Sequence, residues 1–414
     1  METCDVAIVG SGIIGSSIAF ELSRAKLRVL LFDRQTPARE ASWAAAGMLS
    51  ASPDAPEALP LVPLAKESLR LYSQFVAAVE EAAGGPAQGQ AQYAREGALQ
   101  VFQASHGEAV RDALLAQHRT LGIAAEPISI DAARRMEPAL GSGARAVAWL
   151  PGEATVDPRL LCEAVLAAAQ RAGAALRAGC AVAAIEREPR GSAAHGEGGR
   201  CVGVVAGGDR IAAKHVVVAA GAFSRLLAQS SVGARGDADD WLARCAPAHP
   251  VRGQMIALRT SSVRLRRVLR SDRGYLVPRR DGRIIAGSTL EDAGFEKRVT
   301  PAGVQQILSA ALELAPALAG AEIVETWSGL RPGSPDSLPI VGPCGVEGVL
   351  IATGHYRNGI LLAPVTAKLI AEWILRGSVE PKLAAQIGLE RFSPLRFAEA
   401  KPLSGAPKSA AAIS

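Results

Sequence analysis

DVAIVGSGIIG, residues 5–15, takes the chain from a short apolar run directly into the glycine pattern G-x-G-x-x-G. The apolar run is typical of a buried strand. Residues 14–22 then place an apolar side chain at every fourth position, as on one face of a helix. A second apolar run, residues 28–32, ends at Asp33. Strand, helix and strand within about 30 residues predict a βαβ unit, and therefore an α/β fold built on a parallel sheet.

The surroundings of the glycine pattern are those of a dinucleotide-binding turn. Gly10 permits the tight turn, Gly12 lets backbone N–H groups approach a pyrophosphate, and Gly15 lets the helix pack close to the strand. The helix N-terminus offers partial positive charge to the phosphates. The carboxylate of Asp33 can accept hydrogen bonds from a ribose hydroxyl, and its charge disfavours NADP. The pattern does not separate NAD from FAD, but the lack of a G-x-x-x-x-G-K-[ST] motif excludes a P-loop.

Composition and charge exclude several classes of protein. The chain has 414 residues, 49% of them hydrophobic, so it can bury a core without disulfides or metal ions. The net charge of +5 is modest, and the densest basic run, residues 264–273, contains no interleaved aromatic residue, so it predicts a solvated face and no nucleic-acid site. The six cysteines form no CxxC pair and have no histidine at ligand spacing, which predicts no metal site.

The sequence also favours a soluble, cytoplasmic protein. The N-terminus lacks a charged n-region and a small-residue cleavage site. No uncharged apolar run reaches the ~18 residues that a membrane-spanning helix needs. Scattered cysteines fit buried thiols in a reducing compartment.

One segment goes beyond a generic dinucleotide-binding protein. Residues 41–49, ASWAAAGML, contain four small residues that suit a backbone passing close to a flat ligand. Three further segments agree with it, at residues 152–162 (GEATVDPRLLC), 327–339 (WSGLRPGSPDSLP) and 354–364 (GHYRNGILLAP). Together they resemble the D-amino acid oxidase family of FAD enzymes, and within it the glycine-oxidising branch of thiamine biosynthesis.

The resemblance implies a Rossmann-type FAD-binding domain joined to a mixed-sheet α+β substrate domain. We expect residues 1–85, 148–222 and 322–393 to form a discontinuous FAD-binding domain, 86–147 and 223–321 the substrate domain, and 394–414 a disordered tail. Residues 233–250 read as a polar surface insertion, and residues 191–199 as a hairpin tip rich in Gly and Ser.

Two arginines and a tyrosine are the candidate substrate-binding residues. Arg331 lies in Gly-Leu-Arg-Pro, which reads as a rigid turn, and its planar guanidinium can grip a carboxylate with two N–H groups. The resemblance implies that Arg331 holds the substrate carboxylate, that Arg357 is a second arginine at the site mouth, and that Tyr275 donates to the same carboxylate. A neutral amine can lose hydride directly to the flavin, so we predict no catalytic acid or base and place His355 in a flavin loop.

The resemblance further implies which residues contact the FAD. The loop at residues 41–48 should run along the flavin, Val182 should meet the adenine end, and the turn at residues 354–361 should offer amide donors and a helix N-terminus to the pyrimidine edge. Gly329 stands where family members with covalently attached flavin have a cysteine, so we expect non-covalent FAD. The predicted cofactor-binding residues are Gly10, Gly12, Ile13, Ile14, Gly15, Asp33, Arg34, Ala41, Ser42, Ala46, Gly47, Met48, Val182, His355, Tyr356, Arg357, Asn358, Gly359, Ile360 and Leu361.

The activity that the resemblance implies is oxidative deamination of glycine and other small amino acids. Dioxygen would accept the electrons, and the glycine imine would supply the thiazole of thiamine, with thiazole synthase downstream. We expect a homo-oligomer, often a tetramer in this family. Four alternatives stay open: a D-amino acid dehydrogenase with another electron acceptor, an oxidase of sarcosine or larger D-amino acids, an RNA-modifying flavoprotein, and a cofactor-binding module without catalysis.

Overall fold

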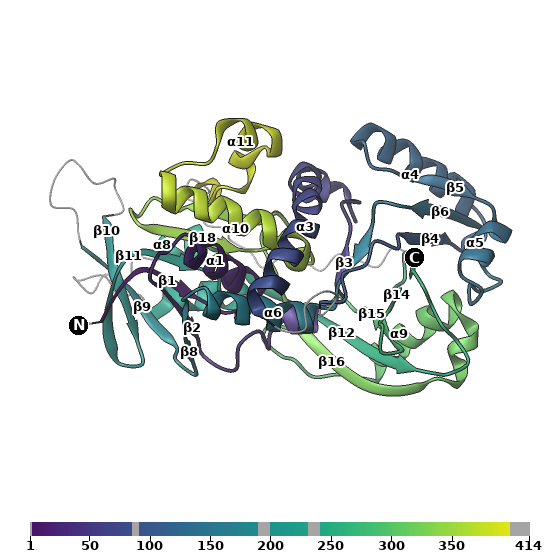
Figure 1. Cartoon of the computed structure of the whole chain (residues 1–414). Coiled ribbons are helices and arrows are strands. Elements are labelled where there is room, and N and C mark those ends of the chain that lie inside the picture. Colours follow the sequence, from purple (N-terminus) through teal and green to yellow (C-terminus); the bar gives the residue numbers. More distant parts are fainter. Residues whose placement is uncertain (1, 85–90, 189–198, 231–240, 398–414) are drawn as a thin grey trace.

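Two large sheets organise the molecule, as Figure 1 shows for the computed structural model, which describes residues 2–84, 91–188, 199–230 and 241–397. The first sheet has the order β17-β18-β11-β1-β2-β8; β10 also pairs with β11, and β9 pairs with β10. Its strands are β1 (Glu2–Val9), β2 (Val29–Asp33), β8 (Ala175–Ala178), β9 (Val182–Glu188), β10 (Arg200–Ala206), β11 (Asp209–Val218), β17 (Ile340–Pro343) and β18 (Val349–Thr353). The pairs β18·β11, β11·β1, β1·β2 and β2·β8 are parallel, which confirms the predicted parallel sheet.

Both faces of this parallel sheet are covered, and its central strands are therefore apolar on both sides. One face carries the helices α1 (Ile13–Arg24), α3 (Val62–Ala83), α6 (Pro158–Arg171) and α10 (Gly359–Arg376). The other face is covered by β9 and β10 together with α7 (Ser224–Ser230) and α8 (Trp241–Cys245). Helix α6 begins as predicted, because the Asp157 carboxylate accepts hydrogen bonds from the backbone N–H groups of Arg159 and Leu160.

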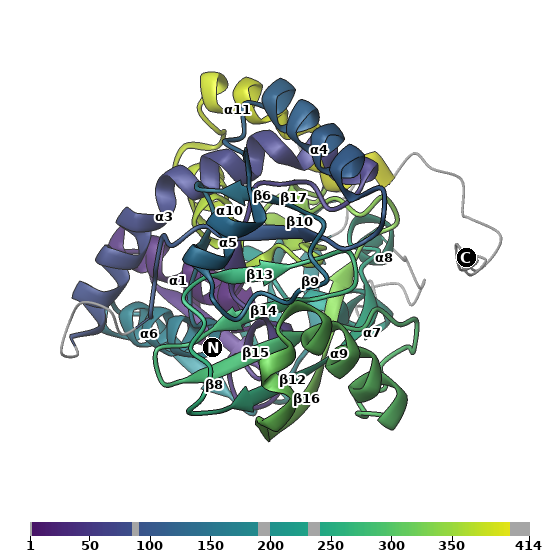
Figure 2. The same ribbon diagram turned by 90° about the vertical axis from the view of Figure 1, so that its right-hand side faces the viewer.

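The second sheet is mixed, with the order β16-β12-β15-β14-β13-β4-β6-β5. Its strands are β4 (Ala98–Phe102), β5 (Glu126–Ile128), β6 (Ala146–Leu150), β12 (His249–Arg259), β13 (Val268–Arg270), β14 (Tyr275–Pro278), β15 (Arg283–Gly287) and β16 (Glu322–Gly333). Only β13·β4 is a parallel pair among the described residues. Helix α9 (Pro301–Leu314) packs on it (Figure 2), and α4 (Gly107–Leu121) and α5 (Ile130–Met136) lie near β4 to β6.

Three segments differ from the sequence-based expectations. Residues around Arg331 form the end of β16 and not a turn, because β16 is an edge strand, where the missing N–H of Pro332 costs no sheet hydrogen bond. Part of the expected surface insertion is α8, whose Trp241 and Leu242 are buried in the core. Pro394 begins a short 3-10 turn that ends at Phe397, and the Arg396 guanidinium there binds Asp336.

The other predictions about loops, the tail and the domain bounds have the following outcome. Residues 191–198, 231–240 and 398–414 lie outside the described residues. The two sheets divide the chain at points other than the expected domain bounds, because β6 crosses the bound at residues 147–148 and all of β16 belongs to the second sheet. The division into two domains itself stays a prediction.

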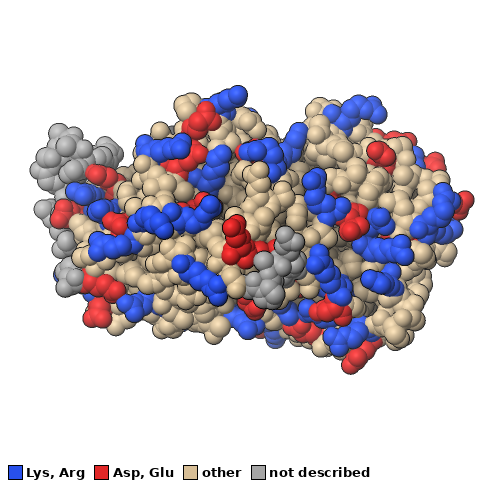
Figure 3. Space-filling model, in the orientation of Figure 1, with Lys and Arg blue, Asp and Glu red and all other residues tan. Residues whose placement is uncertain are grey.

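The surface carries both signs of charge. On the face drawn in Figure 3, acidic and basic side chains are interspersed over most elements. Within the described ranges, no helix combines the length and the apolar character that a bilayer crossing requires. All six cysteines are free thiols, and only Cys180 is more than slightly exposed.

Candidate active site

A cavity of about 650 Å³ is lined by elements of both sheets, within the size range of cofactor sites. Its lining starts at the glycine turn after β1 and follows the loop at residues 41–48. It ends at Tyr275 and Arg331 in the second sheet and at the turn before α10. The glycine turn, the small-residue loop and the two candidate carboxylate-binding residues therefore share one continuous space.

The glycine turn has no room for side chains. A Cβ at Gly10, whose φ is +101°, would lie 2.5 Å from the Ala219 carbonyl oxygen, and a Cβ at Gly15 would lie 1.9 Å from the Gly10 carbonyl oxygen. At the start of α1, Gly12 provides no side-chain cap, and the Ile13 N–H donates to Ser42 Oγ at 3.0 Å. The N-terminus of α1, with the Ser42 hydroxyl on its first N–H, therefore lies at the cavity as an anion-binding element.

Asp33 stands at the end of β2, on the wall of the same cavity. Its Oδ2 accepts hydrogen bonds from the backbone N–H and the hydroxyl of Ser11, at 3.0 and 2.6 Å, and its Oδ1 accepts from the Gln35 N–H at 3.1 Å. The neighbouring Arg34 lies over the ring of Phe223 at 3.6 Å. These contacts hold the Asp33 carboxylate and the Arg34 guanidinium, which stacks on Phe223, beside the glycine turn. A ribose and an adenine would lie at this place.

The loop with the small residues is fixed from the opposite sheet. Gly47 has a φ of +76°, and its Cβ would lie 1.9 Å from the Val156 carbonyl oxygen. The Ala46 carbonyl accepts a hydrogen bond from Arg279 Nη2 at 2.6 Å, and the Ala44 carbonyl accepts from Trp327 Nε1 at 3.1 Å. Burial lowers the pKa of Arg279 to about 10, so this guanidinium stays charged at neutral pH.

Arg331 is partly buried at the end of β16, with its guanidinium against strand β12. Nη2 donates to Ser288 Oγ at 2.7 Å, and Nη1 donates to the carbonyl oxygens of Thr289 and Arg252 at 3.2 and 3.3 Å. A Cβ at Gly253 would lie 2.2 Å from Nη1, so only glycine leaves space for this guanidinium. Burial lowers the pKa of Arg331, but an arginine stays protonated at neutral pH.

Tyr275 and Arg357 complete this end of the cavity. The nearby Tyr275 raises the pKa of Arg331, which opposes the effect of burial. The Tyr275 hydroxyl lies 3.9 Å from Met255 Sδ. Arg357 Nη1 lies 3.3 Å from Asp54 Oδ2, in an ion pair whose two side chains are partly exposed. The structure therefore brings the three candidate substrate-binding residues together, with Arg331 inside and Arg357 nearer solvent.

His355 is buried and belongs to the wall of the cavity. Its Nε2 lies 3.0 Å from Thr366 Oγ1, and burial lowers its pKa to about 3. The imidazole is therefore neutral at physiological pH. That His355 takes no part as acid or base stays a prediction.

Of the predicted cofactor-binding residues, all but two line the cavity. Gly15 instead supports the glycine turn from behind. Leu361 is buried on α10, and its carbonyl accepts a hydrogen bond from Ser68 Oγ at 2.6 Å. These two residues serve packing rather than contact with the cavity.

Sequence reasoning missed a polar wall of the cavity. Arg270 Nη2 lies 3.0 Å from Glu153 Oε1, and its Nε donates to Gln100 Oε1 at 2.6 Å. Ser52 Oγ lies 2.8 Å from His118 Nε2. The expectation of a solvated face is wrong for Arg270, because Glu153 compensates its charge inside the protein. Separate segments meet only in the folded chain here, so no local pattern could have shown this wall.

Comparison with known proteins identifies the family. The chain matches the family model described as FAD dependent oxidoreductase (DAO) over residues 5–373, and it belongs to this family. It is similar to the bifunctional protein ThiO/ThiG of Synechocystis sp., with 35% identity over 95% of this chain and 54% of that protein. The chain thus spans about half the length of such bifunctional relatives.

Two further relatives match along nearly their whole length. The glycine oxidase of Pseudomonas aeruginosa is 34% identical, over 89% of this chain and 93% of that enzyme. The crystal structure of glycine oxidase from Geobacillus kaustophilus matches with a TM-score of 0.83 and 30% identity, over 96% of this chain and 99% of that chain. The predicted family resemblance and fold class are confirmed.

The residues present fit FAD, the cofactor of this family. The turn at Gly10 and Gly12, which has no side chains, and the start of α1 suit a pyrophosphate. The loop at residues 41–48 presents small residues to the cavity, as a flat ring system requires. Among the described residues, no cluster of His, Cys, Asp and Glu could hold a metal ion.

Proposed function

We propose that this chain catalyses the oxidative deamination of glycine and other small amino acids. In this reaction glycine, O₂ and water give glyoxylate, ammonia and H₂O₂. The observation that carries the proposal is the partly buried Arg331 guanidinium, which lines the same cavity as the dinucleotide turn. The similarity to enzymes named glycine oxidase supports the same substrate class.

The protein's own contribution is to bind and orient the substrate. Arg331 binds the carboxylate through its planar fork, Tyr275 donates to the same carboxylate, and Arg357 adds positive charge at the mouth. FAD, when bound, supplies the hydride acceptor for the substrate α-carbon. With its pKa lowered to about 3, His355 is too weak a base to take a proton from a substrate ammonium, so the reaction requires an amine that reaches the site unprotonated.

The same geometry favours FAD held without a covalent bond. A side chain at Gly329 would place its Cβ 2.4 Å from the Ala44 Cβ, so β16 has no space for a cysteine at this position. We infer that the cofactor is held by the residues that line the cavity from the glycine turn to Ile360.

We further propose a link to the assembly of the thiamine thiazole. A relative that matches almost the entire chain is a bifunctional ThiO/ThiG protein, of which the match covers 54%. We infer that the glycine imine passes to a separate thiazole synthase, and that the chain acts as a homo-oligomer in the cytoplasm. The six free thiols support a reducing compartment.

One experiment tests the reaction and its rivals. The purified protein is mixed anaerobically with glycine, sarcosine or D-alanine while flavin absorbance at its visible maximum is followed. We expect bleaching by glycine and, in air, one H₂O₂ for each glyoxylate. Bleaching without peroxide would identify a dehydrogenase, and faster bleaching by sarcosine or D-alanine another substrate. A flavin that no amine bleaches would overturn the proposal.

A further inference from the structure

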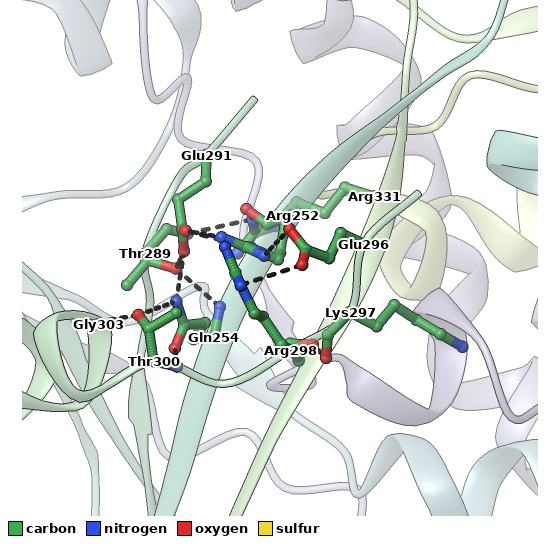
Figure 4. A network of polar contacts seen from close by, with 11 residues as sticks. Arg252, Gln254, Thr289, Glu291, Glu296, Lys297, Arg298, Thr300, Gly303 and Arg331 are labelled. Carbon is green, nitrogen blue, oxygen red and sulfur yellow. Dashed lines mark hydrogen bonds and ion pairs between the residues drawn. The ribbon is translucent and has the colours of Figure 1, made fainter. Parts of the chain in front are cut away.

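A polar network of Arg252, Gln254, Thr289 and Glu291 lies next to Arg331 (Figure 4), and these four residues are not part of the cavity lining. Its centre is Arg252 of β12, a buried arginine whose Nε and Nη2 both donate to Glu291 Oε2, at 3.1 and 2.5 Å. The backbones of the same two residues also pair, with N–H to carbonyl distances of 2.9 and 3.0 Å. Glu291 therefore binds β12 through both its side chain and its backbone.

The second carboxylate oxygen of Glu291 holds two further groups. Oε1 accepts hydrogen bonds from Gln254 Nε2, at 2.8 Å, and from the Thr289 hydroxyl. The same hydroxyl accepts from the Gln254 backbone N–H at 2.8 Å. Burial alone would raise the pKa of Glu291, but hydrogen bonds from Thr289, Arg252 and Gln254 lower it, so the carboxylate is ionised at neutral pH.

The groups that Glu291 holds are the groups that hold Arg331. The Thr289 and Arg252 carbonyls accept the two hydrogen bonds from Nη1 of Arg331, and Ser288, next to Thr289, accepts the bond from Nη2. Nη1 and Nη2 of Arg331 donate to these three oxygens, and the Tyr275 hydroxyl also hydrogen-bonds to the guanidinium. Arginine has five N–H donors, so the guanidinium keeps donors for a carboxylate on the side that faces Tyr275.

We propose that Glu291 is a positioning residue for the substrate: without touching it, its carboxylate fixes the carbonyls that aim Arg331. The proposal rests on the proposed function, in which Arg331 binds the substrate carboxylate. If these carbonyls shift, the charge of Arg331 stays in the site, but its guanidinium N–H groups no longer point at the substrate carboxylate. An error of about 1 Å in such a placement can cost on the order of 100-fold.

The test compares Glu291→Gln with Glu296→Gln. Glu296 also lies near Arg252, at 3.5 Å from Nη1, but it is about half exposed, and the described hydrogen bonds of Thr289 go to Gln254, Glu291 and Arg331 instead. We expect Glu291→Gln to raise the KM for glycine and the Kd for acetate, read from the flavin spectrum, about tenfold. We expect kcat and FAD content of the folded variant to change little, and Glu296→Gln to match wild type.

A double variant separates positioning from a structural role. In an Arg331→Lys background, Glu291→Gln should add no further loss of acetate affinity, because the fork that it aims is already gone. Additive losses, or an unchanged acetate Kd in the single variant, would overturn the proposal. If Glu291→Gln does not fold, Thr289→Val removes one hydroxyl contact and should weaken acetate binding in the same direction; an unchanged Kd would then count against the proposal.

Acetate binding also keeps this proposal distinct from the proposed function. If the wild-type protein binds acetate through Arg331 but does not oxidise glycine, the proposed reaction fails while the role of Glu291 is still measured. If glycine is oxidised but acetate affinity does not depend on Glu291, only the positioning proposal fails.

Discussion

The shape of the guanidinium at residue 331 matters as much as its charge, because three hydrogen bonds to Ser288, Thr289 and Arg252 fix its plane. Arg331→Lys keeps the charge and loses the fork. We expect kcat/KM for glycine to fall by about 100-fold, equivalent to about 2.7 kcal/mol. Peroxide formation at varied glycine concentration measures this. Arg357→Lys, in a partly exposed ion pair, should cost much less, and a larger loss there would assign the carboxylate to Arg357 instead.

A second prediction at this scale concerns His355 and the pH dependence of stability. The folded state lowers the pKa of His355 from 6.5 to about 3, so below pH 6.5 the unfolded chain binds a proton that the folded chain does not. The free energy of unfolding of the wild type therefore decreases as pH falls from about 6.5 towards 3. In His355→Gln this decrease should be smaller by a few kcal/mol over the same range. Urea unfolding at a series of pH values checks it, and parallel profiles would contradict it.

Sequence reasoning reached the residues that obey a local rule and missed those that depend on pairing across the sheets. Gly10, Gly12 and Asp33 follow from a strand, a turn and a helix within one short stretch, and Arg331 from a family motif. Arg270 gave no such signal, because its partner Glu153 is far away in the sequence. A charged residue is buried only where a distant residue compensates it, which a local pattern cannot show.

At the scale of elements, the close contact between α1 and the glycine turn makes a strong prediction. A Cβ at Gly15 would lie 1.9 Å from the Gly10 carbonyl oxygen, so Gly15→Ala must displace α1 or the turn. We expect this variant to purify without FAD and to lose a few kcal/mol of stability. Gly152→Ala is the matched control, because nothing lies within 4 Å of its added Cβ. A yellow Gly15→Ala protein would show that the turn does not bind the cofactor.

Element bounds were harder to predict than element types. The strands β1, β2, β11 and β18 and the helices after Gly12, Asp157 and Asn358 were expected from apolar runs and capping residues. The end of β16 was not, because Gly and Pro usually end a strand. In an edge strand the missing N–H of Pro332 costs no hydrogen bond, so β16 can continue to Gly333. Whether a strand lies at an edge depends on the strand order of the whole sheet, which no local stretch of sequence contains.

At the scale of the whole molecule, the two sheets are joined beside the cavity by an ion pair between α6 and β16. Both terminal nitrogens of Arg159 lie 2.9 Å from the two carboxylate oxygens of Glu325, and its guanidinium lies 3.5 Å from the centre of the Trp43 ring. Its Nε donates to the Trp43 carbonyl at 3.3 Å, within the loop expected to run along the flavin. One side chain thus connects the parallel sheet, the mixed sheet and the flavin loop.

We therefore expect Arg159→Lys to weaken the binding of FAD without preventing folding. Lysine keeps the charge but loses the two-pronged contact and the flat stacking surface on Trp43. The partly exposed pair should contribute only about 1 kcal/mol to stability, so thermal unfolding of the FAD-free protein should shift by a few degrees at most. FAD release, followed by the rise in free flavin fluorescence on dilution, should become several-fold faster. Arg298→Lys, in an exposed pair with Glu296, should release FAD at the wild-type rate. Equal release rates in all three proteins would mean that the flavin loop is held by Arg279 and Trp327 without help from Arg159.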